Sequence, residues 1–184
     1  RWARQVALPE IERMIADNDV WRNLVPPFRL AEQVEAIIPR DSKLTELFSI
    51  CSLNIDVKTE PPGAKAFMKE YATPEAEWTF VGETPIEKLR VPVGIFRWKL
   101  EKEGYETVLA AGTTWKAASL SVDKPSTPDV LMRILDKEGS IPPDMVRVPG
   151  ADLPMGKLED FFIDRYEVTN KQFMEFVDKG GYRN

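Results

Sequence analysis

The stretch Thr59-Glu60-Pro61-Pro62-Gly63-Ala64 decides how the middle of this chain folds. Two adjacent prolines donate no backbone hydrogen bond, and the glycine after them can adopt a positive φ, so the segment predicts a tight turn. An alternation of apolar and polar residues precedes it, with Leu53, Ile55 and Val57 on the apolar side. Such a period of two is typical of a strand with one buried and one exposed face, so a strand is expected to end at this turn.

Turn signals and alternating patterns recur as far as residue 135. Further turns are predicted at Val81-Gly82-Glu83-Thr84-Pro85, at Pro92-Val93-Gly94 and at Lys102-Glu103-Gly104-Tyr105. Strands are predicted around residues 64–71, 78–80, 96–101, 105–110, 115–120 and 130–135, and the clearest is 96–101. Short strands at this density predict an antiparallel β-sandwich over residues 51–136.

These separated motifs, in this order, resemble the PEGA domain over residues 52–122. The resemblance implies a small β-sandwich of the kind found in large bacterial surface and signalling proteins. It implies no established chemistry for the domain itself.

Residues 1–50 predict helices. Pro9 fits the first turn of one helix, or lies inside a longer, kinked one. A second helix is expected after Pro26-Pro27 and must end before Pro39, and a third begins after Asp41 as its N-cap. The segment resembles a tetratricopeptide repeat, and a generic helical hairpin explains the pattern equally well.

Residues 137–184 have a pattern of their own. A capping box of Thr169 and Gln172 predicts the start of a helix near the end of the chain. Three motifs in this segment resemble the opening of the formylglycine-generating (sulfatase-modifying) enzyme family over residues 144–184: Met145-Val146-Arg147-Val148-Pro149-Gly150, Met155-Gly156 and Phe162-Ile163-Asp164-Arg165-Tyr166-Glu167-Val168-Thr169-Asn170. The copper-binding cysteine pair, calcium sites and substrate groove of that family come later in its sequence, so the resemblance implies no cofactor and no catalytic residue in this chain.

Together these patterns predict an α+β multidomain chain, with an N-terminal helical hairpin, an antiparallel β-sandwich and a C-terminal partial α/β module. Its 184 residues, 43% of them apolar and 30% charged, suffice for a folded core. Lys and Arg number 25 against 30 for Asp and Glu, and no block of one sign occurs. Nucleic acid is therefore excluded as an expected partner, because phosphate binding needs a concentrated basic patch.

The sequence contains no histidine and one cysteine, Cys51. A Ser-His-Asp triad, a Cys-His dyad and a histidine-bearing zinc site are therefore impossible within the chain. Cys51 follows Phe48 by three residues on the apolar stripe of a predicted helix, which favours a buried small hydrophobic side chain over a reactive thiol.

Tyr71 and Trp78 are the candidate ligand-binding residues. They flank the predicted loop 72–77, and each ring offers apolar area with a polar edge to a carbohydrate or a peptide, although such rings also close sandwich ends. An acidic cluster lacks the spacing of a calcium loop, so we interpret it as solvated surface: Glu159, Asp160, Asp164 and Glu167. No catalytic, cofactor-binding or metal-binding residue is predicted.

The order of motifs resembles the region after the kinase domain of bacterial Ser/Thr protein kinases, but the phosphate-binding and catalytic motifs of a kinase do not occur. The main hypothesis is a non-catalytic spacer or a ligand- or protein-binding region of a larger bacterial multidomain signalling protein. One alternative is the N-terminal part of a formylglycine-generating oxidase whose catalytic residues lie further along. Another is a tetratricopeptide-like adaptor.

Both ends of the chain suggest partners. The opening Arg1-Trp2-Ala3-Arg4 is of the kind found where a membrane helix emerges into water, which would fit an extracytoplasmic region tethered upstream. An ordinary exposed helix start explains it more readily. No apolar run is long enough to cross a bilayer. The aromatic-rich segment 161–176 holds more apolar residues than one strand and one helix cover, so it is expected to dock elsewhere or to pair with a second copy.

Overall fold

The computed structural model describes residues 1–17, 23–114, 130–153 and 156–183. Contacts divide the chain into two compact units. One comprises Arg1–Glu103 with Thr107–Leu135, and the other Gly104–Glu106 with Asp136–Asn184. The described helices and sheets confirm the predicted α+β class. The expected strand at 115–120 lies outside the described residues.

The first unit begins with one continuous helical stretch. A π-helical turn, η1 (Ala3–Ala7), runs directly into α1 (Leu8–Ala16), and Pro9 occupies the first turn of α1. Proline has no N–H to donate to the preceding turn, and a widened turn before it accommodates that loss. Pro9 therefore lies in the first turn of α1, as predicted, and also inside a longer helical stretch.

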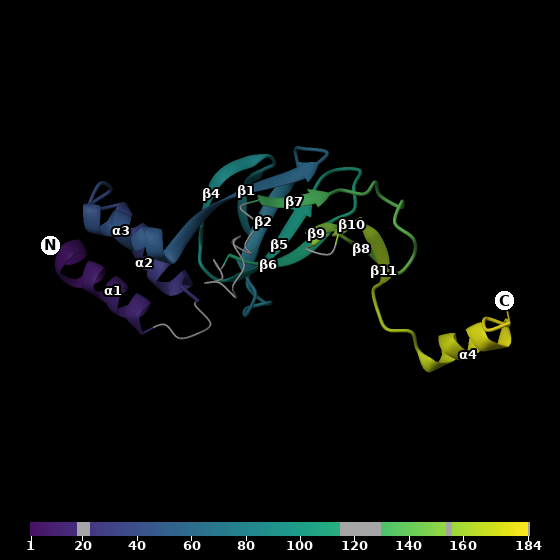
Figure 1. The fold of residues 1–184 in the computed structure, drawn as a ribbon. Helices are drawn as coiled ribbons and strands as arrows, with labels where there is room; N and C mark the ends of the chain where they lie inside the picture. Colours follow the sequence, from purple (N-terminus) through teal and green to yellow (C-terminus); the bar gives the residue numbers. More distant parts are fainter. Residues whose placement is uncertain (18–22, 115–129, 154–155, 184) are drawn as a thin grey trace. The chain divides into compact units, whose positions relative to one another are not determined.

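Two further helices complete the helical segment. α2 (Val25–Glu35) begins one residue before the two prolines, so the predicted start after them was late. α3 (Ser42–Cys51) confirms the predicted cap, because the Asp41 carboxylate accepts hydrogen bonds from the N–H groups of Lys43 (3.0 Å) and Leu44 (3.4 Å). The three helices lie side by side (Figure 1) and share one apolar core.

The first sheet of the sandwich has three strands in the order β4-β1-β7. β1 (Ser52–Glu60) pairs antiparallel with β4 (Ile86–Pro92) and parallel with β7 (Val130–Ile134). The return of a last strand near residue 130 is therefore confirmed. Its parallel direction was not predicted from the sequence.

The second sheet is antiparallel and has four strands in the order β3-β2-β5-β6. These are β2 (Lys65–Glu70), β3 (Thr79–Glu83), β5 (Ile95–Glu101) and β6 (Val108–Thr113). Phe96, Trp98 and Leu100 of β5 are buried, as their alternation predicted, and so are Ile55 and Val57 of β1. The opposite side of this sheet, which we call the outer face, carries the alternate residues.

The Pro-Pro-Gly turn is held by a relay of hydrogen bonds between two buried threonines. Ala64 N–H donates to the Thr84 hydroxyl (2.9 Å), the two threonine hydroxyl oxygens lie 2.5 Å apart, and the Thr59 hydroxyl donates to the Pro61 carbonyl (2.8 Å). Each hydroxyl has one proton, so Thr84 must donate to Thr59. Gly63 takes a φ of 85°, as the turn prediction required. The Pro-Pro-Gly turn and the later Gly-Glu-Thr-Pro motif are thus joined by these hydrogen bonds.

The second unit contains two small antiparallel pairs and a helix. β8 (Met145–Val148) pairs with β11 (Phe161–Asp164), and β9 (Ala151–Leu153) pairs with β10 (Gly156–Leu158). α4 (Asn170–Asp178) starts with the predicted capping box of Thr169 and Gln172, which is confirmed.

Apolar side chains of this unit are exposed by a third or more, and they include Phe161, Phe162, Ile163, Tyr166, Phe173 and Phe176. Pairing with a second copy stays a prediction.

Candidate binding surface

The outer face combines cations and aromatic rings at its centre. Cross-strand register places Lys69 of β2 opposite Arg97 of β5, and Phe67 opposite both Lys99 of β5 and Phe80 of β3. Successive side chains of a strand point to opposite faces of the sheet, so these residues lie on the outer face while their neighbours in the same strand point into the sandwich. The edges of the face add exposed apolar area, with Phe80 54% and Leu109 70% exposed.

Each of the three central cations lies over an aromatic ring. The Lys69 ammonium is 4.5 Å from the centroid of the Trp78 ring, the Arg97 guanidinium 4.2 Å from that of Tyr71, and the Lys99 ammonium 4.6 Å from that of Phe67. Lys99 also approaches Trp78 at 5.6 Å. Attraction between a cation and a ring face holds these flexible side chains in place.

Tyr71 and Trp78, the residues singled out from the sequence, both belong to this face. Tyr71 is 45% exposed and Trp78 is half-buried, and one side of each ring is covered by a cation. They are therefore parts of a wider aromatic and cationic surface rather than a bare stacking platform. Sequence reasoning missed Phe67, Phe80 and the cations, although the period-two alternation of β2 and β5 was the available signal.

The loop between Tyr71 and Trp78 is tied to the same face. The Lys69 ammonium donates to the carbonyl of Ala76 at 3.0 Å and to that of Pro74. Arg97 Nε donates to the Tyr71 carbonyl at 3.2 Å. The cations thus position the loop as well as the rings.

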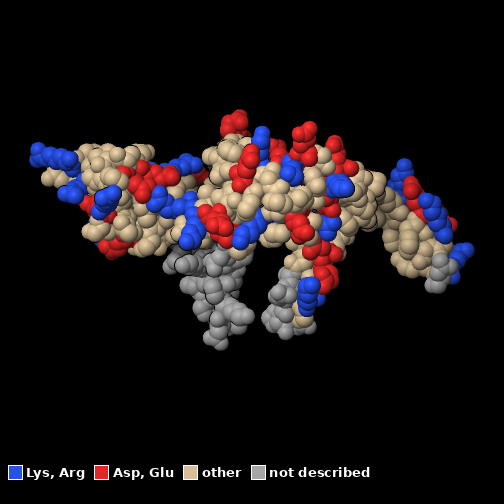
Figure 2. Space-filling model, turned by 90° about the horizontal axis from the view of Figure 1, so that it is seen from above, with Lys and Arg blue, Asp and Glu red and all other residues tan. Residues whose placement is uncertain are grey.

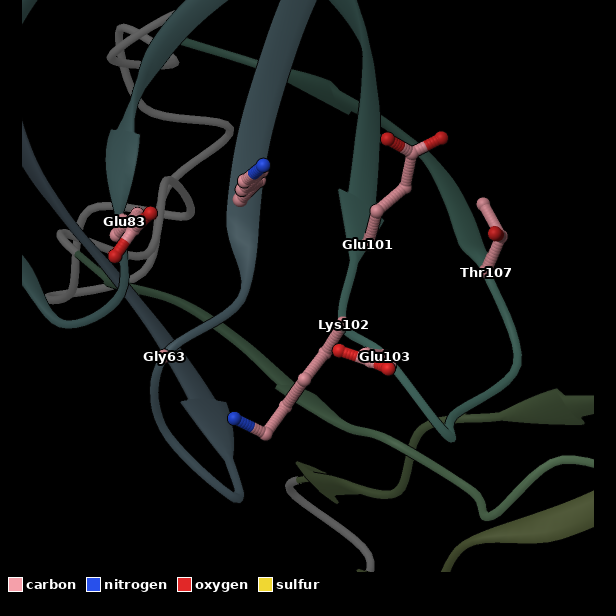
Figure 3. Close-up of a pocket in the computed structure, with 7 residues that line it drawn as sticks. Gly63, Glu83, Glu101, Lys102, Glu103 and Thr107 are labelled. Atoms are coloured by element: carbon pink, nitrogen blue, oxygen red, sulfur yellow. The ribbon is translucent and has the colours of Figure 1, made fainter.

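A shallow cavity of about 710 Å³ opens at the Gly63 end of the same sheet (Figure 3). Lys65 lies there between Glu83 on one neighbouring strand and Glu101 on the other. Opposite charges that face each other across strands stabilise a sheet. These three charges therefore have a structural role, and their arrangement does not indicate a ligand.

The acidic cluster near the C-terminus is only partly free surface. Asp160 accepts a hydrogen bond from the Gly150 N–H (2.8 Å) and contacts Arg147 (3.3 Å), which also binds Asp136. The Arg147 guanidinium holds the pKa of Asp136 below its usual range. Within the described ranges, no three residues of the His, Cys, Asp and Glu types stand close enough to hold a metal ion.

Cys51 is fully buried at the end of α3, as predicted. Burial in this apolar core raises the pKa of its thiol to about 11, because the thiolate would lose its hydration.

This burial predicts a thiol that does not react in the folded protein. We expect negligible labelling by a thiol-specific disulfide reagent at neutral pH, and complete labelling once urea is added. The free energy of unfolding should also fall as pH rises from about 9 to about 11, because the unfolded thiol ionises first. Rapid labelling of the native protein at neutral pH would contradict the buried placement.

Charges of both signs are interspersed on the face shown in Figure 2.

None of the described helices is both long and apolar enough to cross a bilayer.

Comparison with known protein families gives two separate matches on this chain. Residues 52–125 match the PEGA domain. The match covers both sheets of the sandwich except β7, and it contains the outer face, Tyr71 and Trp78. Residues 133–184 match the sulfatase-modifying factor enzyme 1-like domain, in the order that the motifs predicted. No curated protein and no solved structure matched.

Proposed function

We propose that this region is a non-catalytic spacer in a multidomain protein, built so that the PEGA sandwich is held rigidly on its helical segment and displays its outer face. The observation that carries the proposal is the β4–β5 turn, which enters the helical core. Val93 of this turn packs with buried residues of all three helices. Its N–H donates to the Cys51 carbonyl (3.0 Å) and its carbonyl accepts from the Leu24 N–H (2.8 Å).

Contacts of polar side chains support the same attachment. Arg90 of β4 forms a two-point ion pair with Glu35 of α2, and its guanidinium lies 4.1 Å from the Phe48 ring centroid. Arg29 of α2 pairs with Glu70 of β2 at 2.7 Å. A planar guanidinium suits both the bidentate pair and the stacking, so Arg90 fixes direction as well as distance. A joint fixed at several points transmits orientation, which is what a spacer requires.

Hydrogen exchange of the full chain tests this proposal. We expect backbone amides of α2, α3, β1 and β5 to share one protection factor, because opening the helices would expose the core that Val93 completes. Amides of α4, whose side chains are exposed, serve as the internal control and should exchange sooner. Helices that lose protection well before β1 and β5 would contradict the rigid spacer.

A second candidate function rests on the match over residues 133–184, namely the accessory part of a formylglycine-generating oxidase. A mass-spectrometric assay of a cysteine-containing sulfatase peptide tests whether this chain has oxidase activity of its own. We expect no conversion by this chain, since its single thiol, Cys51, is buried and lies outside the matched segment. Formation of formylglycine would favour the oxidase.

A further inference from the structure

The outer face holds like charges together at its centre. Lys69 and Arg97 face each other directly on neighbouring strands, and Lys99 is the diagonal neighbour of Lys69. Like charges directly opposite destabilise a sheet, and the rings attract these cations without neutralising their charge. Of the three, Lys99 alone has a carboxylate partner in the described part of the chain, Glu101 at 2.7 Å. The face therefore has unbalanced positive charge at a fixed place, although the whole chain carries a net charge of −5.

Arg97 is the cation best placed to meet a partner. Its Nε donates a hydrogen bond to the Tyr71 carbonyl, and one side of its guanidinium lies over the Tyr71 ring. Among the described residues Arg97 forms no ion pair. The terminal amino groups of such a guanidinium form a rigid fork that matches the two oxygens of a carboxylate.

The surroundings of Arg97 indicate what else the partner carries. Ile95 (41% exposed) shares its strand, and Tyr71, Phe80 and Leu109 add exposed apolar area on the same sheet. The sequence holds no Asn or Gln between residues 55 and 169, so this sheet offers no side-chain amide to pair with the hydroxyls of a polysaccharide. Charge and apolar area without amide side chains fit a polypeptide segment in which acidic and apolar residues alternate.

We propose that the outer face of the β3-β2-β5-β6 sheet binds an acidic, apolar polypeptide segment, with Arg97 receiving a carboxylate and the rim formed by Tyr71, Ile95, Phe80 and Leu109 receiving apolar side chains. This binding goes beyond the spacer function and does not depend on it. A flat face of this kind favours transient, salt-sensitive association, since its cations remain in contact with water.

The test is a titration of the full chain with short synthetic peptides, in which binding is measured by calorimetry and by changes in amide chemical shifts. The probe alternates Glu with Leu, and the control peptide alternates Lys with Leu. We expect the acidic peptide to bind, with the largest shifts in β2 and β5, and binding to weaken as salt rises. Arg97→Ala should weaken it by about tenfold, and Arg97→Lys by several-fold, because the ammonium keeps the charge but lacks the fork.

A matched variant separates the site from general charge. Arg40→Ala removes the same charge from an exposed position outside the sheet, and binding should stay within about twofold of the original. Equal losses in Arg97→Ala and Arg40→Ala would overturn the proposal, as would shifts confined to other strands. Binding of an oligogalacturonate in place of the acidic peptide would overturn the proposal as well. None of these outcomes would change the hydrogen-exchange result that tests the spacer function.

Discussion

Val93→Asp is expected to lower the free energy of unfolding of the first unit by more than about 4 kcal/mol. The change removes an apolar side chain that is 9% exposed, and it places a carboxylate in a core whose other members are apolar side chains and the Cys51 thiol. The lost burial costs about 2 kcal/mol. A buried charge without a partner adds several kcal/mol more.

The matched control is Ile95→Asp, two residues later in the same chain segment. Ile95 is 41% exposed on the outer face, so its replacement should cost less than about 1 kcal/mol. Urea unfolding followed by both helical circular dichroism and tryptophan fluorescence measures the difference. If Val93→Asp removed only the helical signal and left the midpoint of the sandwich unchanged, the shared core would not couple the two parts.

Much of the fold could be predicted because the deciding interactions are local. The alternation in β1 and β5 identified their buried sides correctly, and the caps Asp41 and Thr169 marked helix starts. Each of these features depends on residues within a few positions of one another. The parallel return of β7 beside β1 could not be predicted in this way, since it depends on contacts between distant parts of the sequence.

The candidate surface was predicted only in part for the same reason. Tyr71 and Trp78 are conspicuous in the sequence because they flank a loop. Their roles, however, depend on Arg97 and Lys99, which reach them only through the register of β2 on β5. Likewise, nothing near Val93 in the sequence indicates that a turn of the sandwich completes the helical core. Such contacts follow from the assembled sheets and helices.

The second large effect is expected at Thr84, where Thr84→Val should cost about 1–3 kcal/mol. Valine keeps the shape of the side chain but leaves the buried Ala64 N–H without its acceptor and ends the relay to Thr59. Thr84→Ser keeps the hydroxyl and loses one methyl group, which is worth about 0.8 kcal/mol. Urea midpoints of the two variants therefore distinguish hydrogen bonding from packing.

A double-mutant cycle with Thr59→Val makes the Thr84 argument sharper. In a relay with one direction, Thr84 donates to Thr59 and Thr59 donates to the Pro61 carbonyl, so removing either hydroxyl weakens the other's contacts. We therefore expect the double variant to lose less stability than the two single losses added together. Strictly additive losses would mean that the two threonines act separately. A relay would instead explain why the Pro-Pro-Gly turn and the distant Gly-Glu-Thr-Pro motif occur together in one sandwich.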